Sequence, residues 1–411
     1  MSKLNKNNES FYILLIIFGC LQQLISSELL TLIGIVYFIF LVIQSKIRIK
    51  LGWSKPIIIL LLIFLIGSFV GLKNFYSRNY LRDIYYCINP IIILFIGMNL
   101  SNNKTENNKL LNSVVAISVL SSLFSSILAT VSILEGNNFF NLRKFFEYVM
   151  WGNVISIGIL ITKISEKNGK KDKAQIISLV FLIIVSILGM SRTVWVEIAI
   201  LLLILFLSSK KKAKFFLKYF KIFFILSVVS FFVIVNIPSK TKTILINKIL
   251  NSFNEVNYNN HWTSTKIQKN WRGYEISQAK VQFNKGTLLQ KIIGYGFGKG
   301  IYVGRYSMLV HQTGEYIYII HNGFYNILIK EGIVGLLIYI LFYLEIIIYS
   351  FKSYMITKNK KDLLIVGITL CLIVYTYLVK GIFADFQQIN ALLVIGGWLR
   401  LKRKNNDEIA I

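Results

Sequence analysis

Long, uninterrupted apolar runs constrain this chain more than any other feature of its sequence. Runs of roughly 15 to 25 hydrophobic residues recur along most of the 411 positions, and only three prolines interrupt the chain. The mean hydropathy is +0.62. Because a helix needs roughly 20 apolar residues to cross a bilayer, the pattern predicts an all-α integral membrane protein and excludes a soluble globule.

The distribution of charge favours membrane topology over nucleic-acid binding. The formal net charge is +28, but the Lys and Arg residues cluster between the apolar runs and form no separate basic domain. Aromatic and basic residues do not interleave as they do on nucleic-acid-binding surfaces. No nucleic-acid partner is therefore expected.

The basic residues also orient the predicted spans. We expect about twelve transmembrane helices, at residues 11–27, 29–45, 55–72, 84–100, 110–134, 148–165, 175–190, 194–208, 219–237, 324–350, 363–380 and 384–400. With a cytoplasmic amino terminus, and with the ends of the adjoining spans included, the cytoplasmic segments carry 27 Lys and Arg and the short external loops carry seven. This is the positive-inside bias, so both termini are predicted to face the cytoplasm.

The spans divide the chain into three regions. Residues 1–237 hold helices 1 to 9, residues 238–320 form one large external loop, and residues 321–411 hold helices 10 to 12 and a cytoplasmic tail. Helical spacing of apolar residues predicts short helices in the loop near 245–253 and from Trp271 onward. The glycine-rich stretch 294–300 lacks the context of a nucleotide-binding motif, and we interpret it as a flexible connection.

The apolar stretch from 175 to 208 is interrupted by Ser191-Arg192-Thr193 and has lysines on both flanks. A single span would place one basic flank outside, so we predict a hairpin with both flanks inside. Each arm has only about 15 residues, or roughly 22 Å of helix, so the tip lies below the outer surface. Arg192 then needs a water-filled cavity or an anionic partner, unless it snorkels to the outer headgroups.

His321 is a candidate general base, because it lies where the external loop enters the tenth span and an imidazole transfers protons near neutral pH. His261 and His311 lie away from any predicted helix end and are the alternatives for this role. The three histidines are not spaced as a metal site, and the three cysteines, all within apolar runs, do not indicate a disulfide. Lys380 and Asp385 are expected to pair at the outer ends of the last two spans.

Several short motifs occur in a characteristic order. They are Ser191-Arg192-Thr193 at the hairpin tip, Arg272-Gly273-Tyr274-Glu275 in the loop, the glycine turn 294–300, and His321-Asn322 leading into Gly332-Ile333-Val334-Gly335. In this order and topology the chain resembles the O-antigen polymerase and O-antigen ligase superfamily, over about residues 175–350.

The resemblance implies a metal-independent glycosyltransferase of the GT-C type, without a cofactor, in the bacterial cytoplasmic membrane. Such an enzyme moves glycan from an undecaprenyl-diphosphate-linked oligosaccharide to an acceptor hydroxyl on the outer face. His321 matches the family's histidine, and Arg192 and Arg272 match its diphosphate-contacting arginines. Glu275 would orient Arg272 or a sugar hydroxyl, and Asn322 supports the histidine. A base for the hydroxyl and positive charge for the departing phosphates are what this reaction requires.

Three functions stay open at this point. The leading expectation is a polymerase that joins repeat units into O-antigen, capsule or a related polysaccharide, with a chain-length regulator and a flippase as expected partners. An O-antigen ligase performs the same chemistry on a lipid A-core acceptor. A lipid-linked oligosaccharide flippase also fits twelve spans, but the chain shows no repeat at half its length, as transporters often do.

Overall fold

The computed structural model describes residues 2–44, 55–135, 143–166, 172–189, 191–207, 262–310, 314–384 and 388–409. Over these ranges the protein is almost entirely helical, as predicted, with one two-stranded antiparallel sheet that the sequence did not predict. The predicted span 219–237 and the predicted helix near 245–253 lie outside the described residues.

The helices coincide with the other eleven predicted spans, although several ends differ. The long helices are α1 (Ser2–Leu21), α2 (Ser27–Gln44), α3 (Lys55–Gly71), α4 (Arg78–Asn99), α5 (Lys104–Leu134), α7 (Met150–Glu166), α8 (Lys173–Leu188), α9 (Arg192–Leu207), α15 (Gly323–Thr357), α16 (Lys360–Leu378) and α17 (Ile389–Ile409). The short elements are η1 (Leu72–Asn74), α6 (Arg143–Phe146), α12 (Ser264–Lys269), α13 (Trp271–Lys285), α14 (Leu288–Ile293), β1 (Ile301–Tyr302), η4 (Gly304–Val310) and β2 (Tyr316–Ile317).

Six of the described helices are long and apolar enough to cross a membrane. They are α2, α3 with η1, α4, α5, α15 and α16. Two shorter apolar helices, Glu9–Leu21 and Lys173–Leu188, add to these. Large side chains such as Val36, Phe69 and Ile127 face outward from the helices, as on a surface in contact with lipid. The protein is therefore a multi-pass membrane protein, and the number of twelve spans stays a prediction.

Polar side chains determine where several helices begin. The side chains of Ser77, Asn103 and Asn359 accept hydrogen bonds from backbone N–H groups in the first turns of α4, α5 and α16. These groups have no partner inside a helix, so a cap of this kind stabilises the start. The caps lie just outside the apolar runs, which keeps the polar helix ends near the membrane boundary.

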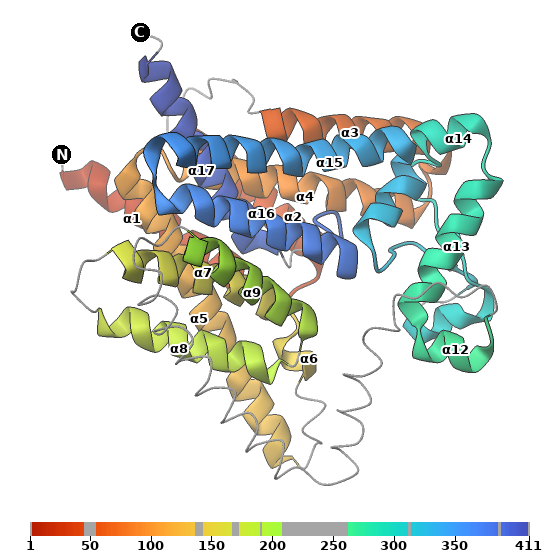
Figure 1. Cartoon of the computed structure of the whole chain (residues 1–411), viewed down its shortest axis with the longest axis horizontal. Helices are drawn as coiled ribbons and strands as arrows, with labels where there is room; N and C mark the ends of the chain where they lie inside the picture. Colours follow the sequence, from red (N-terminus) through yellow and green to blue (C-terminus); the bar gives the residue numbers. More distant parts are fainter. Residues whose placement is uncertain are drawn as a thin grey trace.

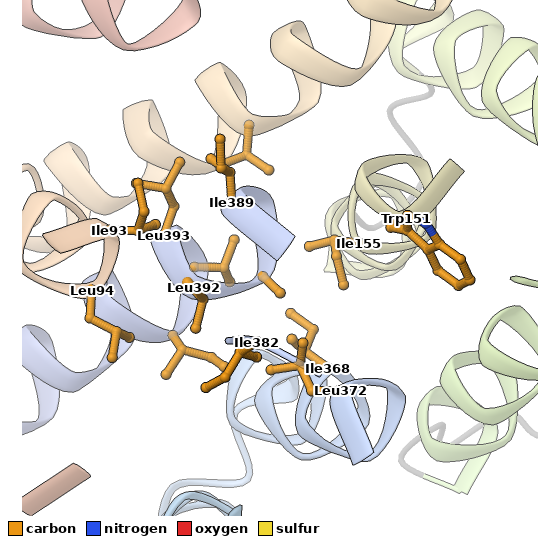
Figure 2. Close-up of a cluster of buried hydrophobic side chains, with 14 of the residues drawn as sticks. Ile93, Leu94, Trp151, Ile155, Ile368, Leu372, Ile382, Ile389, Leu392 and Leu393 are labelled. Atoms are coloured by element: carbon orange, nitrogen blue, oxygen red, sulfur yellow. The ribbon is translucent and has the colours of Figure 1, made fainter. Parts of the chain in front are cut away.

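Close backbone contact joins α4 to α17 at the centre of the bundle. A side chain at Gly97 would overlap the carbonyl of Leu393, and one at Gly396 would overlap the carbonyl of Leu94. Small residues allow helices to approach in this way where the hydrophobic effect does not drive association. Around this contact the apolar side chains of α4, α7, α16 and α17 point toward one another (Figure 2).

The chain ends and the short helices lie at opposite ends of the molecule. In Figure 1 both termini are at the left, and α12, α13 and α14 are at the right, beyond the ends of α3, α4 and α15. Helices α15 and α16 run antiparallel, so α15 begins at the end where α16 finishes. We call α12 to α14 with β1, η4 and β2 the outer unit.

Candidate functional site

The outer unit has a hydrophobic core of its own. Tyr274 lies at its centre, with its ring against Trp262, Trp271 and Tyr306. The Tyr274 hydroxyl donates a hydrogen bond to the carbonyl of Val303, at 3.2 Å. Burial raises the pKa of this phenol, so the hydroxyl keeps the proton that it donates. This anchoring fixes α13 and therefore the direction of the neighbouring residue, Glu275.

Glu275 in α13 and His321, which lies between β2 and α15, form a closely hydrogen-bonded pair. The imidazole Nδ1 of His321 lies 3.0 Å from Oε1 and 2.9 Å from Oε2 of Glu275, and its backbone N–H donates to Oε2 at 3.0 Å. The Glu275 side chain is 1% exposed, whereas the His321 side chain is 27% exposed. The carboxylate is thus buried behind the ring, and the ring reaches solvent. We call this the His321–Glu275 pair.

The pair has a definite chemical consequence. A carboxylate only accepts hydrogen bonds, so the nitrogen facing it must carry the proton. In a neutral imidazole with hydrogen on Nδ1, the other nitrogen, Nε2, holds a lone pair. A histidine oriented by a carboxylate in this way is arranged to accept a proton from a hydroxyl group.

Asn322 fixes the start of α15 immediately after His321. Its side-chain oxygen accepts a hydrogen bond from the backbone N–H of Tyr325, at 3.2 Å, and the residue is almost fully buried. At the next position, a side chain on Gly323 would overlap the carbonyl of Lys380. The beginning of α15 is therefore packed against the segment that follows α16, which holds His321 at the junction of the two helices.

The glycine-rich turn is packed between helices, so its interpretation as a flexible connection was wrong. Gly294, Gly296 and Gly298 have φ angles of +82°, +82° and +80°, which favour glycine. The N–H groups of Tyr295 and Gly296 donate to carbonyls in α15, and that of Phe297 donates to Gly67 in α3. The turn joins α3 to α15, and its tight contacts leave no space for side chains at its glycines.

A buried ion pair completes this junction. Lys330 Nζ lies 2.7 Å from Oδ1 of Asp83 in α4, and both side chains are almost fully buried. The other oxygen, Oδ2, accepts a hydrogen bond from the N–H of Gly298, at 2.8 Å. Two residues after Lys330, the helix α15 breaks at Gly332, with φ 67° and ψ −164°. The Asp83–Lys330 pair thus ties α4, the glycine turn and α15 together beneath the outer unit.

Arg192 lies at the same end of the bundle as the His321–Glu275 pair. It is the first residue of α9, which packs antiparallel against α16, with the Cys371 thiol donating to the carbonyl of Glu197. Because α9 and α16 are antiparallel and Glu197 lies beside Cys371, Arg192, five residues before Glu197, lies beside the end of α16. Thr376 and Lys380, at that end, contact Gly323. α8 and α9 form the predicted hairpin, with Arg192 at its tip (Figure 1).

Arg272 is in the first turn of α13, three residues before Glu275, and is partly buried. Positions three apart share a face of a helix, so Arg272 lies on the side of α13 that carries the carboxylate. The structure therefore brings His321 and Glu275 into direct contact, with Asn322 next to His321 in the chain, and places Arg192 and Arg272 at the same end. His261, His311 and Asp385 lie outside the described residues, and among the described ones no three His, Cys, Asp or Glu side chains group as a metal site.

Sequence reasoning identified Glu275 and expected it to orient Arg272 or a sugar hydroxyl, but it did not predict the contact of this carboxylate with His321. It missed Asp83 and Lys330 altogether. The sequence offers one sign of this pair, because each of two predicted helices has a charged residue inside or beside its apolar run. A charge in such a place often has a buried partner.

Comparison with known proteins finds a related family. Residues 177–340 match the family model described as O-antigen ligase, and the matched segment contains every site residue named from the sequence. A search of characterised proteins gives no match to the chain. The match over residues 177–340 confirms that this segment resembles the O-antigen polymerase and ligase superfamily.

Proposed function

We propose that this protein is a polysaccharide polymerase, which joins undecaprenyl-diphosphate-linked oligosaccharides on the outer face of the bacterial cytoplasmic membrane. The acceptor is a hydroxyl group on the terminal sugar of a second lipid-linked repeat unit. His321 takes the proton of this hydroxyl at Nε2 while its oxygen bonds to the anomeric carbon of the donor glycan. The bond from that carbon to the diphosphate breaks, and the electron pair leaves with the phosphate oxygen.

The observation that carries the proposal is the His321–Glu275 pair. A buried carboxylate orients a partly exposed imidazole at the end of the bundle that holds the outer unit. The departing diphosphate gains negative charge, which Arg192 and Arg272 stabilise with guanidinium groups that match phosphate oxygens in shape. Glycoside hydrolases usually use two carboxylates at a characteristic separation, and a transferase of this kind does not need such a pair.

The first experiment replaces His321 in a cell that makes the polymer. His321→Ala is expected to reduce polymer synthesis by at least about 100-fold, the scale of a general base. Arg192→Ala should also shorten or abolish the glycan ladder. His261→Ala and His311→Ala are matched controls and should leave the ladder intact. Normal long-chain glycan from well-expressed His321→Ala protein would overturn the assignment of the base.

A ligase is the second candidate, because the family whose model matches is described as O-antigen ligase. The two functions differ in what a deletion strain accumulates. Without a polymerase, single repeat units stay on undecaprenyl diphosphate or are transferred one at a time. Without a ligase, long polymer accumulates on undecaprenyl diphosphate and none reaches the lipid A-core. The first pattern supports our proposal, and the second replaces it with the ligase.

The same strain tests the flippase, which belongs to a different class of function. A lost flippase leaves lipid-linked single repeats on the inner face of the membrane. A lost polymerase leaves them on the outer face. Digestion of intact spheroplasts with a glycosidase that cannot cross the membrane distinguishes the two, and protected repeats would contradict the polymerase.

A further inference from the structure

Arg82 lies in the second turn of α4, which begins at Arg78. Its guanidinium carbon is 5.4 Å from the centre of the Tyr318 ring, a distance at which a cation is attracted to an aromatic face. Tyr318 directly follows β2 and precedes His321 by three residues. The side chain therefore extends from the membrane helices onto the segment that carries the proposed base.

The Arg82 side chain has hydrogen-bond donors without acceptors. Its Nε and Nη2 atoms are shielded from solvent and have no hydrogen-bond partner among the described residues. A buried charged donor without an acceptor is unfavourable, so such groups are nearly always paired in proteins. A guanidinium stays protonated at any physiological pH, and Arg82 cannot avoid this cost by losing its charge.

The nearby carboxylates are already engaged. Asp83, the next residue, uses one oxygen for Lys330 and the other for Gly298. Glu28 accepts a hydrogen bond from the Tyr85 hydroxyl, at 2.6 Å. In the described part of the chain, no carboxylate forms an ion pair with Arg82. Among the described residues, then, nothing accepts a hydrogen bond from Nε or Nη2 of Arg82, and a bound anion is a ligand that would supply the acceptor.

We propose that Arg82 binds a phosphate oxygen of the lipid-linked diphosphate, and that Tyr318 holds its guanidinium in position. The proposal rests on the glycosyl transfer proposed above and adds a third cation to Arg192 and Arg272. Arg82 approaches the site from α4, outside the segment 177–340 that matches the O-antigen ligase family. The planar donors of arginine fit phosphate oxygens, and an aromatic ring stacked on the plane leaves its edge available for them.

The test measures binding by the purified full-length protein, with undecaprenyl diphosphate as the probe and undecaprenol as the matched lipid without phosphate. Arg82→Ala should weaken binding of undecaprenyl diphosphate by about tenfold or more, the loss of one charge-assisted hydrogen bond, and leave undecaprenol binding unchanged. Arg82→Lys keeps the charge and should recover part of the affinity. Arg78→Ala is the control, because Arg78 is exposed one turn earlier on the same helix.

Two further arms exclude simpler explanations. Phosphatidylglycerol carries a phosphate, as other anionic headgroups do. If Arg82→Ala weakens binding of phosphatidylglycerol but not of undecaprenyl diphosphate, the assignment of Arg82 to the substrate is wrong. Tyr318→Leu removes the ring and should weaken undecaprenyl diphosphate binding, whereas Tyr318→Phe keeps the ring and should bind as wild type does. The comparison of the two Tyr318 variants tests the proposal even if the Arg82→Ala protein does not fold.

Failure of this inference is distinguishable from failure of the proposed function. His321→Ala is expected to bind undecaprenyl diphosphate normally and to make no polymer, because the base acts on the acceptor hydroxyl. If that result is obtained while Arg82→Ala binds as wild type does, the role of Arg82 is wrong and the polymerase stands. If His321→Ala makes normal polymer, the proposed function is wrong regardless of Arg82.

Discussion

The Glu275 carboxylate is fully buried, and a buried carboxylate is unfavourable unless hydrogen-bond donors meet it. The backbone N–H and the ring Nδ1 of His321 both do so. The same contacts fix the place of the imidazole and the nitrogen that carries its proton. The cost of burial is thus offset by an interaction that also orients Nε2, and a general base needs that orientation as much as it needs a lone pair.

Glu275→Gln tests whether the charge behind the imidazole matters for turnover. Glutamine keeps the shape of the side chain but loses its charge, and its amide group can donate as well as accept. We expect the kcat for lipid-linked oligosaccharide to fall by about 100-fold with little change in KM, since the carboxylate acts on the base and not on substrate binding. Kinetics of the purified variant in detergent or nanodiscs provide the measurement.

Glu315→Gln is the matched control, because Glu315 is an exposed carboxylate in the same outer unit. It should retain the activity of the wild type. Equal losses in the two variants would show that the outer unit responds to any change of charge. A Glu275→Gln enzyme with full kcat would show that His321 does not depend on the carboxylate.

At the level of single residues, the sequence indicates what a side chain can do but not what it contacts. His321 was predictable because it lies at the end of a polar loop and the start of an apolar run. Its pairing with Glu275, 46 residues earlier, depends on how α13 packs within the outer unit and against the start of α15. That packing follows from the aromatic contacts of Tyr274, which no local spacing reveals.

At the scale of helices, the Asp83–Lys330 pair joins α4 to α15 and should contribute strongly to stability. Lys330→Met leaves the Asp83 carboxylate buried without its cation. We expect this to cost about 3 to 5 kcal/mol, measured as a lower midpoint of thermal unfolding in detergent. Adding Asp83→Asn removes the unpaired charge and keeps an oxygen for the N–H of Gly298, so the double variant should regain most of the loss.

The recovery in the double variant distinguishes this pair from a general effect of substitution in the core. If Lys330→Met is as stable as the wild type, the ion pair contributes nothing. If the double variant is less stable than Lys330→Met, the two side chains act independently, and the geometry of the pair does not explain their effect.

Gly332, where α15 breaks, offers a second prediction at this scale. Its φ of 67° disfavours a side chain, and a Cβ there would overlap the carbonyl of Ile292 in α14. Gly314 has φ 96° but no atom within 4 Å of such a Cβ. Gly314→Ala should therefore cost only about 1 kcal/mol of backbone strain, whereas Gly332→Ala should cost several times as much.

The same thermal unfolding assay compares the two alanine variants directly. If both lose about equal stability, backbone conformation alone explains Gly332, and the close approach of α14 to α15 is not important. The expected difference also predicts lower glycosyl transfer in Gly332→Ala, because displacement of α14 would shift the turn that packs on Asp83 and α3.

Among the elements, apolar runs predicted helices well and irregular features poorly. The length of a run fixes a helix to within a few residues, as α2 and α8 show. The break at Gly332 was not predictable, because the glycine follows Glu331 in an otherwise continuous helical pattern. The packed glycine turn was read as flexible, since contacts with α3 and α15, far away in the sequence, are what hold it.

For the whole molecule, the arrangement places all the proposed chemistry at one end. In Figure 1 the outer unit and the start of α15 lie at the right, the adjoining ends of α8 and α9 point the same way, and both termini lie at the left. The distribution of Lys and Arg predicts that the end with the termini is cytoplasmic. The proposed transfer between lipid-linked oligosaccharides would then take place on the outer face of the membrane.

Cysteine labelling tests this orientation in intact cells. Leu288 is an exposed residue of α14 in the outer unit, and Lys358 lies between α15 and α16 at the other end. In a chain whose own cysteines at 20, 87 and 371 are replaced by alanine, Leu288→Cys should react with a maleimide that cannot cross the membrane. Lys358→Cys should react only after the cells are made permeable. The reverse pattern would place the outer unit in the cytoplasm and exclude polymer synthesis on the outer face.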